Sequence, residues 1–142
     1  MKKIFLAVIA LITLIACDKK ETVEGANVHI TGNVEGLSQG KLYLQKIEDT
    51  TLVIIDSIQI NDDSKFESHI KLDSPEMLYL ALDRGQTNSI DNSLPFFAEP
   101  GNITIETTLK HFFADAKVKG SKNHDLWIEF KKINDRLNDE NL

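Results

Sequence analysis

Apolar side chains recur at every second position from Val28 to about residue 108. The segment VHITGNV alternates from Val28, KLYLQKI places Leu42 and Leu44 on one face, and KFESHIKL continues the pattern from Phe66. A period of two is typical of half-buried β-strands. The run LVIIDSIQI is rich in β-branched residues, and EMLYLAL is apolar on both faces, as expected for a covered central strand.

Short polar segments separate these runs and predict turns. GLSQG (36–40) is one, NDDS (61–64) is expected to close a hairpin, and EPGN (99–102) places Pro100 and Gly101 at the centre of a type II turn. No helical pattern precedes residue 110, which argues against βαβ units. The sequence therefore predicts a mainly β fold, an antiparallel β-sandwich or open barrel of seven to eight strands with a C-terminal amphipathic α-helix.

The hydrophobic period changes near the C-terminus. Apolar residues recur there at i, i+4, i+7 and i+11, namely Leu126, Phe130, Ile133 and Leu137. This spacing predicts an amphipathic helix of about fourteen residues, with Ser121 or Asn123 as its N-cap. Such a stripe is more often part of a core than a binding surface. Because it belongs to the last element of the chain, it is also a candidate partner-docking surface at Trp127, Phe130 and Ile133.

The N-terminus carries an export pattern. Lys2 and Lys3 precede thirteen mostly apolar residues, 4–16, a run too short for a stable transmembrane helix. Cys17, the only cysteine, follows in the segment LIAC, which resembles the lipobox of bacterial lipoproteins. Its sulfur is therefore expected to carry a diacylglyceryl group. The alternatives are a plain signal-peptidase site with a free thiol, or an uncleaved signal anchor.

These patterns divide the chain into four parts. Residues 1–16 are predicted to be a lipoprotein signal peptide, 17–27 a lipid-anchored tether, 28–120 a β-rich domain and 121–142 a C-terminal helix or linker. The expected location is the cell envelope, anchored to the inner or outer membrane on its periplasmic or surface face. The sequence leaves the choice of membrane and face open.

Charge and residue chemistry bear on the class of function. The net charge of −6 gives no electrostatic basis for binding nucleic acid. Ser57 has neither a nucleophile elbow nor an adjacent base. The four histidines lack zinc-site spacing, so each is expected to be a surface or edge residue: His29, His69, His111 and His124. We therefore expect no catalytic residue, no metal site and no cofactor, and predict that the chain is not an enzyme.

One polar insert, DRGQTNSIDNS (83–93), is the longest loop of the predicted domain. Loops of this length in small β-domains are either plain connections or binding elements. A plain connection is the simpler interpretation. If the loop binds a ligand, its candidate residues are Arg84, Gln86 and Asn88.

An ordered set of motifs carries a family resemblance: ITGNVEG, GKLYLQ, IDSIQI, KFESHIKL, FFAEPGNITI and VKGSKNHD. Together they resemble the N-terminal β-rich domain of unknown function of Bacteroidota-type lipoproteins. That domain usually precedes a thioredoxin-like domain of the thiol–disulfide oxidoreductase or peroxiredoxin kind. The resemblance covers about residues 28–135, and its matching positions are Gly32, Asp56-Ser57, Phe66, Pro100-Gly101 and Gly120-Ser121.

Two hypotheses of function follow. Thiol–disulfide exchange needs an attacking and a resolving thiol, and no Cys-x-x-Cys occurs in this sequence. The first hypothesis is a lipid-anchored, non-catalytic binding or docking module. Its expected partners are membrane lipid, through acylated Cys17, and an envelope protein such as a thioredoxin-like oxidoreductase. The alternative is the N-terminal accessory part of such an oxidoreductase, whose catalytic domain is absent from this chain.

Overall fold

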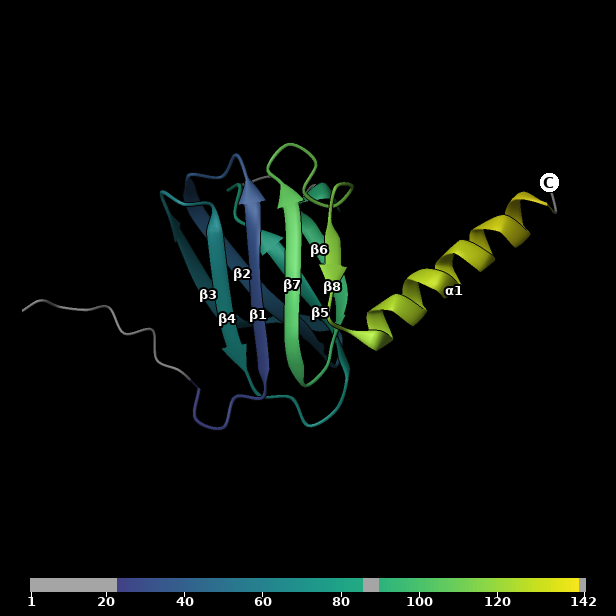
Figure 1. Cartoon of the computed structure of the whole chain (residues 1–142), viewed down its shortest axis with the longest axis horizontal. Coiled ribbons are helices and arrows are strands. Elements are labelled where there is room, and N and C mark those ends of the chain that lie inside the picture. The colour runs from purple at the N-terminus through teal and green to yellow at the C-terminus, as the bar shows by residue number, and fades with distance from the viewer. Residues whose placement is uncertain (1–22, 86–89, 141–142) are drawn as a thin grey trace, which may run out of the picture.

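The computed structural model describes residues 23–85 and 90–140 (Figure 1). Within these ranges the chain forms eight strands: β1 (Val28–Glu35), β2 (Gln39–Glu48), β3 (Thr51–Asn61), β4 (Lys65–Ile70), β5 (Glu76–Leu82), β6 (Ser93–Ala98), β7 (Gly101–Thr108) and β8 (Lys117–Lys119). A single turn of 3₁₀-helix, η1 (Ile90–Asn92), precedes β6, and the long helix α1 (Lys122–Asp139) follows β8. The mainly β fold with a C-terminal helix is confirmed.

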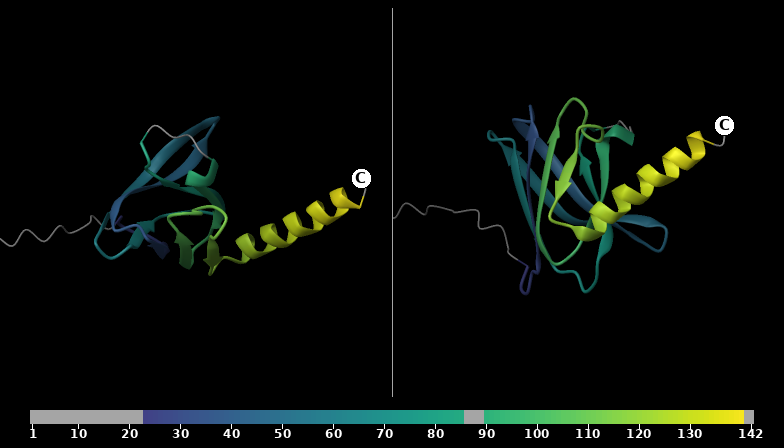
Figure 2. Two further views of the ribbon diagram at one scale, coloured as in Figure 1. Left: turned by 90° about the horizontal axis from the view of Figure 1, so that it is seen from above. Right: turned by 45° about the vertical axis from the view of Figure 1, so that its right-hand side comes forward.

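The strands form two four-stranded sheets that face each other (Figures 1 and 2). One sheet has the order β4-β1-β7-β8 and the other has the order β3-β2-β5-β6. No strand pairing joins the two sheets among the described residues, so the fold is a sandwich and not a closed barrel. As predicted, EMLYLAL is an inner strand, since β5 lies between β2 and β6.

One strand pairing differs from the antiparallel arrangement expected. β1 and β7 run parallel, with Val28 opposite Gly101. A parallel pair needs a long crossover connection, and here the whole β3-β2-β5-β6 sheet, together with β4, lies between β1 and β7 in the chain. The alternating pattern identifies a strand but carries no information about the direction of its neighbour.

Two predicted turns connect the two sheets. The NDDS segment was expected to form a hairpin, yet β3 and β4 belong to different sheets. Asp62 and Ser64 have φ angles of 65° and 60° there, and they turn the chain from one sheet into the other. The EPGN segment likewise links β6 to β7 across the sandwich, with Gly101 at a φ of 131°. Turn residues encode a reversal of the chain but not which strand it pairs with next.

The core lies between the sheets and is built from alternate residues of the strands. Phe96 and Phe112 are the largest of its fully buried side chains. Gly32 faces the same core in β1, and a Cβ atom there would collide with the Phe66 ring and the Ile105 carbonyl oxygen. The aromatic ring of Phe66 therefore occupies space that any larger residue at position 32 would need.

Helix α1 is capped at its first turn and then leaves the sandwich. The Ser121 hydroxyl accepts the His124 N–H at 3.0 Å, which confirms Ser121 as the N-cap. The helix has 18 residues, longer than predicted, and projects from the body in every view (Figures 1 and 2). Among the residues described, no helix combines the length and apolarity needed to cross a membrane.

Candidate docking site

The first turns of α1 are fixed to the sandwich by an aromatic contact. The Trp127 ring meets the Phe97 ring of β6 edge-on, with 6.0 Å between centroids and 76° between planes. The imidazole of His124 lies 5.5 Å from the Trp127 ring and is buried, so the expectation that His124 is a surface or edge residue is wrong. Its Nδ1 accepts the Phe97 N–H at 3.4 Å. Lys131 also contacts the indole, with its ammonium 5.0 Å from the ring centroid. His124 and Trp127 form the attached face of the helix.

Backbone capping also holds the start of α1. Glu99, in the connection between β6 and β7, accepts the Lys122 N–H at 2.8 Å and the Asn123 N–H at 3.3 Å. These bonds, together with the Asn123 side-chain amide, lower the pKa of the Glu99 carboxyl. A carboxylate at a helix N-terminus also interacts favourably with the helix dipole. The first turns of α1, which we call the root of the helix, are therefore held by β6 and the β6–β7 connection. The interactions are the Phe97–Trp127 ring contact and the hydrogen bonds to the Glu99 carboxylate.

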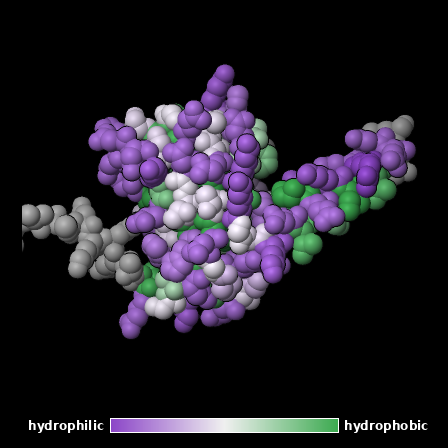
Figure 3. Space-filling view, in the orientation of Figure 1, coloured by the Kyte–Doolittle hydropathy of each residue, from purple (hydrophilic) through white to green (hydrophobic). Residues whose placement is uncertain are grey.

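The predicted apolar stripe points away from the sandwich. At 100° per residue, its centre lies roughly 120° around the helix from the attached face. The exposed fractions of its four residues are 64%, 65%, 41% and 51%, for Leu126, Phe130, Ile133 and Leu137 respectively. Figure 3 shows apolar surface along the projecting helix. The expectation that this stripe belongs to the core is wrong, because the helix attaches through a different face. We call these four residues the helix stripe.

The structure places the three candidate docking residues in two environments. Phe130 and Ile133 belong to the exposed helix stripe. Trp127 is half-buried, and its ring serves the contact with Phe97. Trp127 therefore positions the helix, while Phe130 and Ile133 are available at its surface.

A second apolar surface lies at the tip of the β2–β3 hairpin. Ile47 and Leu52 are paired across the two strands, Ile54 follows on the same face, and each is about half exposed. Sequence reasoning missed this surface. A signal was present, since LVII places apolar residues at consecutive positions of a strand, so that one face must point outward.

The outer face of the β3-β2-β5-β6 sheet connects this tip with the root of the helix. Met77 is paired with Phe97, and Tyr79 with Pro95, across β5 and β6. All four are half-buried. Because Phe97 contacts Trp127, this apolar face extends to the beginning of α1.

The candidate binding loop is described only in part. Arg84 is exposed, and its guanidinium donates to the Leu109 carbonyl oxygen. At the base of the loop Asp83 accepts the Gly85 N–H and the Tyr43 hydroxyl, each at 3.0 Å. These bonds lower the pKa of Asp83 and raise that of Tyr43. The two other candidates, Gln86 and Asn88, lie outside the described residues.

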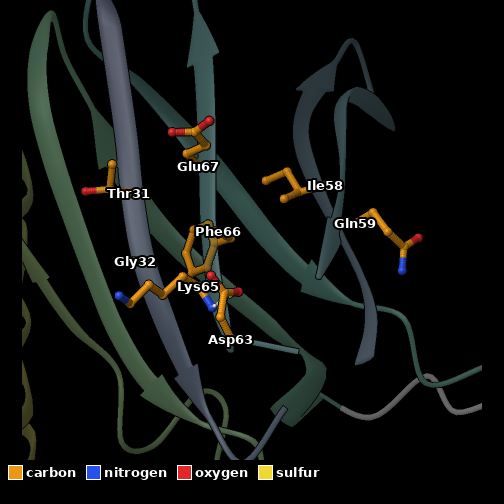
Figure 4. Close-up of a pocket in the computed structure, with 8 residues that line it drawn as sticks. All are labelled: Thr31, Gly32, Ile58, Gln59, Asp63, Lys65, Phe66 and Glu67. Atoms are coloured by element: carbon orange, nitrogen blue, oxygen red, sulfur yellow. Dashed lines mark hydrogen bonds between the residues drawn. The ribbon is translucent and has the colours of Figure 1, made fainter. Parts of the chain in front are cut away.

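A surface cleft opens at the edge of the sandwich between β3 and β4 (Figure 4). It has a volume of about 480 Å³, with Ile58 and Phe66 as its apolar lining. Its charged lining residues, Asp63, Lys65 and Glu67, are all exposed. Polar groups of a small-molecule site are usually few and precisely placed in a concave, mostly apolar pocket. This cleft instead has exposed charges of both signs on an open rim. It therefore resembles a specific small-molecule site less than a concave, mostly apolar pocket does.

The same sandwich edge contains the Asp-Ser motif of the family resemblance. The buried hydroxyl of Ser68 in β4 donates to the Asp56 carboxylate of β3 at 2.5 Å. This hydrogen bond links the edges of the two sheets, since β3 and β4 belong to different sheets. Ser57 is exposed. The motif therefore has a structural explanation.

Two of the histidines meet on the outer face of the other sheet. His29 and His69 are cross-strand partners, and their Nδ1 atoms are 2.7 Å apart. The two residues are far apart in the sequence, so no local spacing pattern indicates the pair. The register of β1 and β4 brings them together. Within the described ranges, no group of three or more His, Cys, Asp or Glu side chains could hold a metal ion. His111 lies separately, 3.4 Å from Asp115.

These features define a mainly β sandwich domain that presents an amphipathic helix at its C-terminal end. A family model with the description Domain of unknown function (DUF4369) matches residues 28–127, and the chain belongs to this family. No curated protein matches the chain. The matched region includes both sheets and ends at Trp127, so it contains the contact that fixes the root of α1.

Proposed function

We propose that this chain is a lipid-anchored docking module of the cell envelope. The export pattern and Cys17 supply the anchor, the sandwich supplies a rigid support, and α1 supplies the docking element. The observation that carries the proposal is the helix stripe, in which Phe130 is 65% exposed. The proposal includes no catalytic step.

The energetics of the helix stripe favour a binding role. Burying one large aliphatic or aromatic side chain contributes roughly 1.5–3 kcal/mol, so four of them lose substantial free energy while they remain in water. Most of the stability of a helix in a protein comes from packing of its apolar face. Contiguous exposed apolar residues on a soluble surface commonly mark an interaction site. The helix stripe fits this description because α1 attaches through the face that contains His124 and Trp127.

The fixed root of the helix supports the same function. The first turns of α1 are held in one orientation relative to the sandwich by the Ser121 cap, the Glu99 hydrogen bonds and the Phe97–Trp127 contact. A binding element that is already ordered loses less conformational entropy when its partner binds. On this basis we propose as partner an envelope protein with a complementary apolar surface. A thioredoxin-like oxidoreductase is one such protein, suggested by the resemblance to domains that precede thioredoxin-like domains.

The same exposed stripe favours a second candidate function. In an N-terminal accessory part of a thioredoxin-like oxidoreductase, the helix would pack against the domain that follows it. The apolar outer face of β5 and β6, which continues from Trp127, is a further surface that such a domain could contact.

Site-specific photocrosslinking in cells tests the docking function. A photoreactive phenylalanine analogue replaces Phe130, and a matched variant carries it at Phe113, an exposed aromatic residue outside α1. We expect a crosslinked product from position 130 and none of the same mass from position 113. Equal labelling from both positions, or no product from position 130, would contradict docking through the helix stripe.

The proposed anchor has its own test. The intact mass of protein extracted from membranes should equal that of residues 17–142 plus acyl chains. A Cys17→Ser variant should lose the acyl mass and leave the membrane fraction. An unacylated Cys17 in a membrane-extracted protein would reject lipid anchoring. A mass larger by a whole domain would favour the accessory-domain function.

A further inference from the structure

We propose that the partner of the helix stripe is a second copy of this chain, and that two α1 helices pair antiparallel. The inference rests on the proposed docking function and identifies the occupant of the same surface. Three features carry it: the spacing of the stripe, the charges beside it and the place where the helix is attached.

The spacing of the helix stripe matches a two-helix seam. Intervals of four, three and four residues separate Leu126, Phe130, Ile133 and Leu137, which is the spacing of a and d positions in a heptad repeat. In an antiparallel pair, Leu126 of one copy lies opposite Leu137 of the other, and Phe130 lies opposite Ile133. Each contact then occurs twice, as a two-fold symmetric interface requires. The seam is therefore complementary to itself.

The charges beside the stripe are self-complementary in the same register. Four charged residues lie within roughly 90° of the stripe on one flank, and their signs alternate along the helix: Lys122, Glu129, Arg136 and Glu140. An antiparallel pair brings this flank against the same flank of the second copy. Glu129 then faces Arg136, and Lys122 faces Glu140, each pair forming twice. Opposite charges at such flanking positions set partner choice and orientation.

A parallel pair would lose this complementarity. It would bring the charged flank of one helix against the other flank of its partner. On this other flank, the residues within roughly 90° of the stripe are Asn123, Trp127 and Asn134. None of them is charged in the described part of the helix. The charge pattern therefore favours the antiparallel arrangement.

The attachment of α1 also suits antiparallel pairing. The contacts between the sandwich and the described part of α1 lie in its first turns, on the face that contains His124 and Trp127, roughly 120° around the helix from the centre of the stripe. An 18-residue helix is about 27 Å long. In an antiparallel pair the two sandwiches lie at opposite ends of this length and do not compete for space. The seam is small beside a standard protein–protein interface, so the dimer should be weak in dilute solution. Anchoring both copies to one membrane raises their effective concentration.

A charge-swap experiment tests the register. The mature chain, residues 17–142 with Cys17→Ser, is studied by sedimentation equilibrium as wild type, as Glu129→Arg and as Arg136→Glu. Each single variant places like charges opposite each other and should weaken the homodimer about tenfold or more. A one-to-one mixture of the two variants restores both ion pairs, and should form a heterodimer about as tight as the wild-type dimer. Both positions are exposed, so circular dichroism should show unchanged folding.

The outcomes separate this inference from the docking function. A wild-type chain that stays monomeric up to about 1 mM overturns the inference. A wild-type dimer whose two charge variants do not recombine also overturns it, because the antiparallel register is then wrong. If the crosslink from position 130 contains a different protein and the chain is monomeric, docking stands and self-pairing fails. A crosslinked product of twice the chain mass, with recombination of the variants, supports both.

Discussion

Trp127 and Phe130 are three residues apart in one helix, yet they serve different surfaces. The Trp127 ring packs edge-on against Phe97 of the sandwich, 6.0 Å between centroids, whereas Phe130 is 65% exposed. The helix thus attaches through one face and presents another. This division explains how a helix with an exposed apolar stripe can be held in a fixed orientation.

The division predicts different costs for two aromatic truncations. Trp127→Ala removes a half-buried ring and its contact with Phe97, and should lower the free energy of unfolding by about 1–3 kcal/mol. Phe130→Ala removes an exposed ring and should change it by less than about 0.5 kcal/mol. Urea unfolding at a protein concentration low enough to keep the chain monomeric measures both. Equal costs for the two variants would mean that Phe130 packs within its own chain.

Gly32 should be intolerant of even a methyl group. Gly32→Ala places its Cβ against the Ile105 carbonyl oxygen and the Phe66 ring, and should cost about 2–4 kcal/mol of unfolding free energy. Thr31→Ala, at an exposed neighbouring position, is the matched control and should be nearly neutral. Adding Phe66→Leu should not rescue Gly32→Ala, because the carbonyl oxygen belongs to the backbone. Full rescue would show that the ring alone sets the limit.

The hydrogen bond between Ser68 and Asp56 should stabilise the open edge of the sandwich. Ser68→Ala removes the donor and leaves the half-buried Asp56 carboxylate without it, at an expected cost of about 1–2 kcal/mol. Asp56→Asn keeps an acceptor oxygen and should cost less than Asp56→Ala. Ser57→Ala, at the exposed adjacent position, is the control. Chemical denaturation of the four variants checks the order, and a cost at Ser57 equal to that at Ser68 would reject this assignment.

Much of the fold could be predicted from local patterns. The alternation around Val28, Leu42 and Phe66 identified strands, and the change of period near Leu126 identified the helix, with Ser121 as one of two candidate caps. These features depend on neighbours along the chain, and a sequence displays such neighbours directly. The partners of the strands could not be predicted, because the parallel β1–β7 pair joins segments separated by most of the domain.

The candidate site was predictable in its residues but not in its arrangement. The stripe was visible as a set of spaced apolar residues, yet the sequence could not tell which face the sandwich would bind. That choice depends on Phe97 and Glu99, which belong to the β6–β7 region and are brought to the helix by the tertiary fold. The His29–His69 contact was missed for a similar reason, since strand register decides it.

His124 should make the stability of the chain depend on pH. Burial lowers the pKa of its imidazole below the ordinary 6.5, while nearby Asp125 acts weakly in the opposite direction. Between that lowered value and 6.5 the folded chain binds fewer protons than the unfolded chain, so the free energy of unfolding rises with pH across this window and falls on acidification. His124→Asn keeps an acceptor near the Phe97 N–H but does not titrate. Urea unfolding between pH 5 and 8 should show a shallower pH dependence for His124→Asn than for wild type. The other three histidines are present in both wild type and His124→Asn, so an identical slope in these two proteins would exclude His124 as the source.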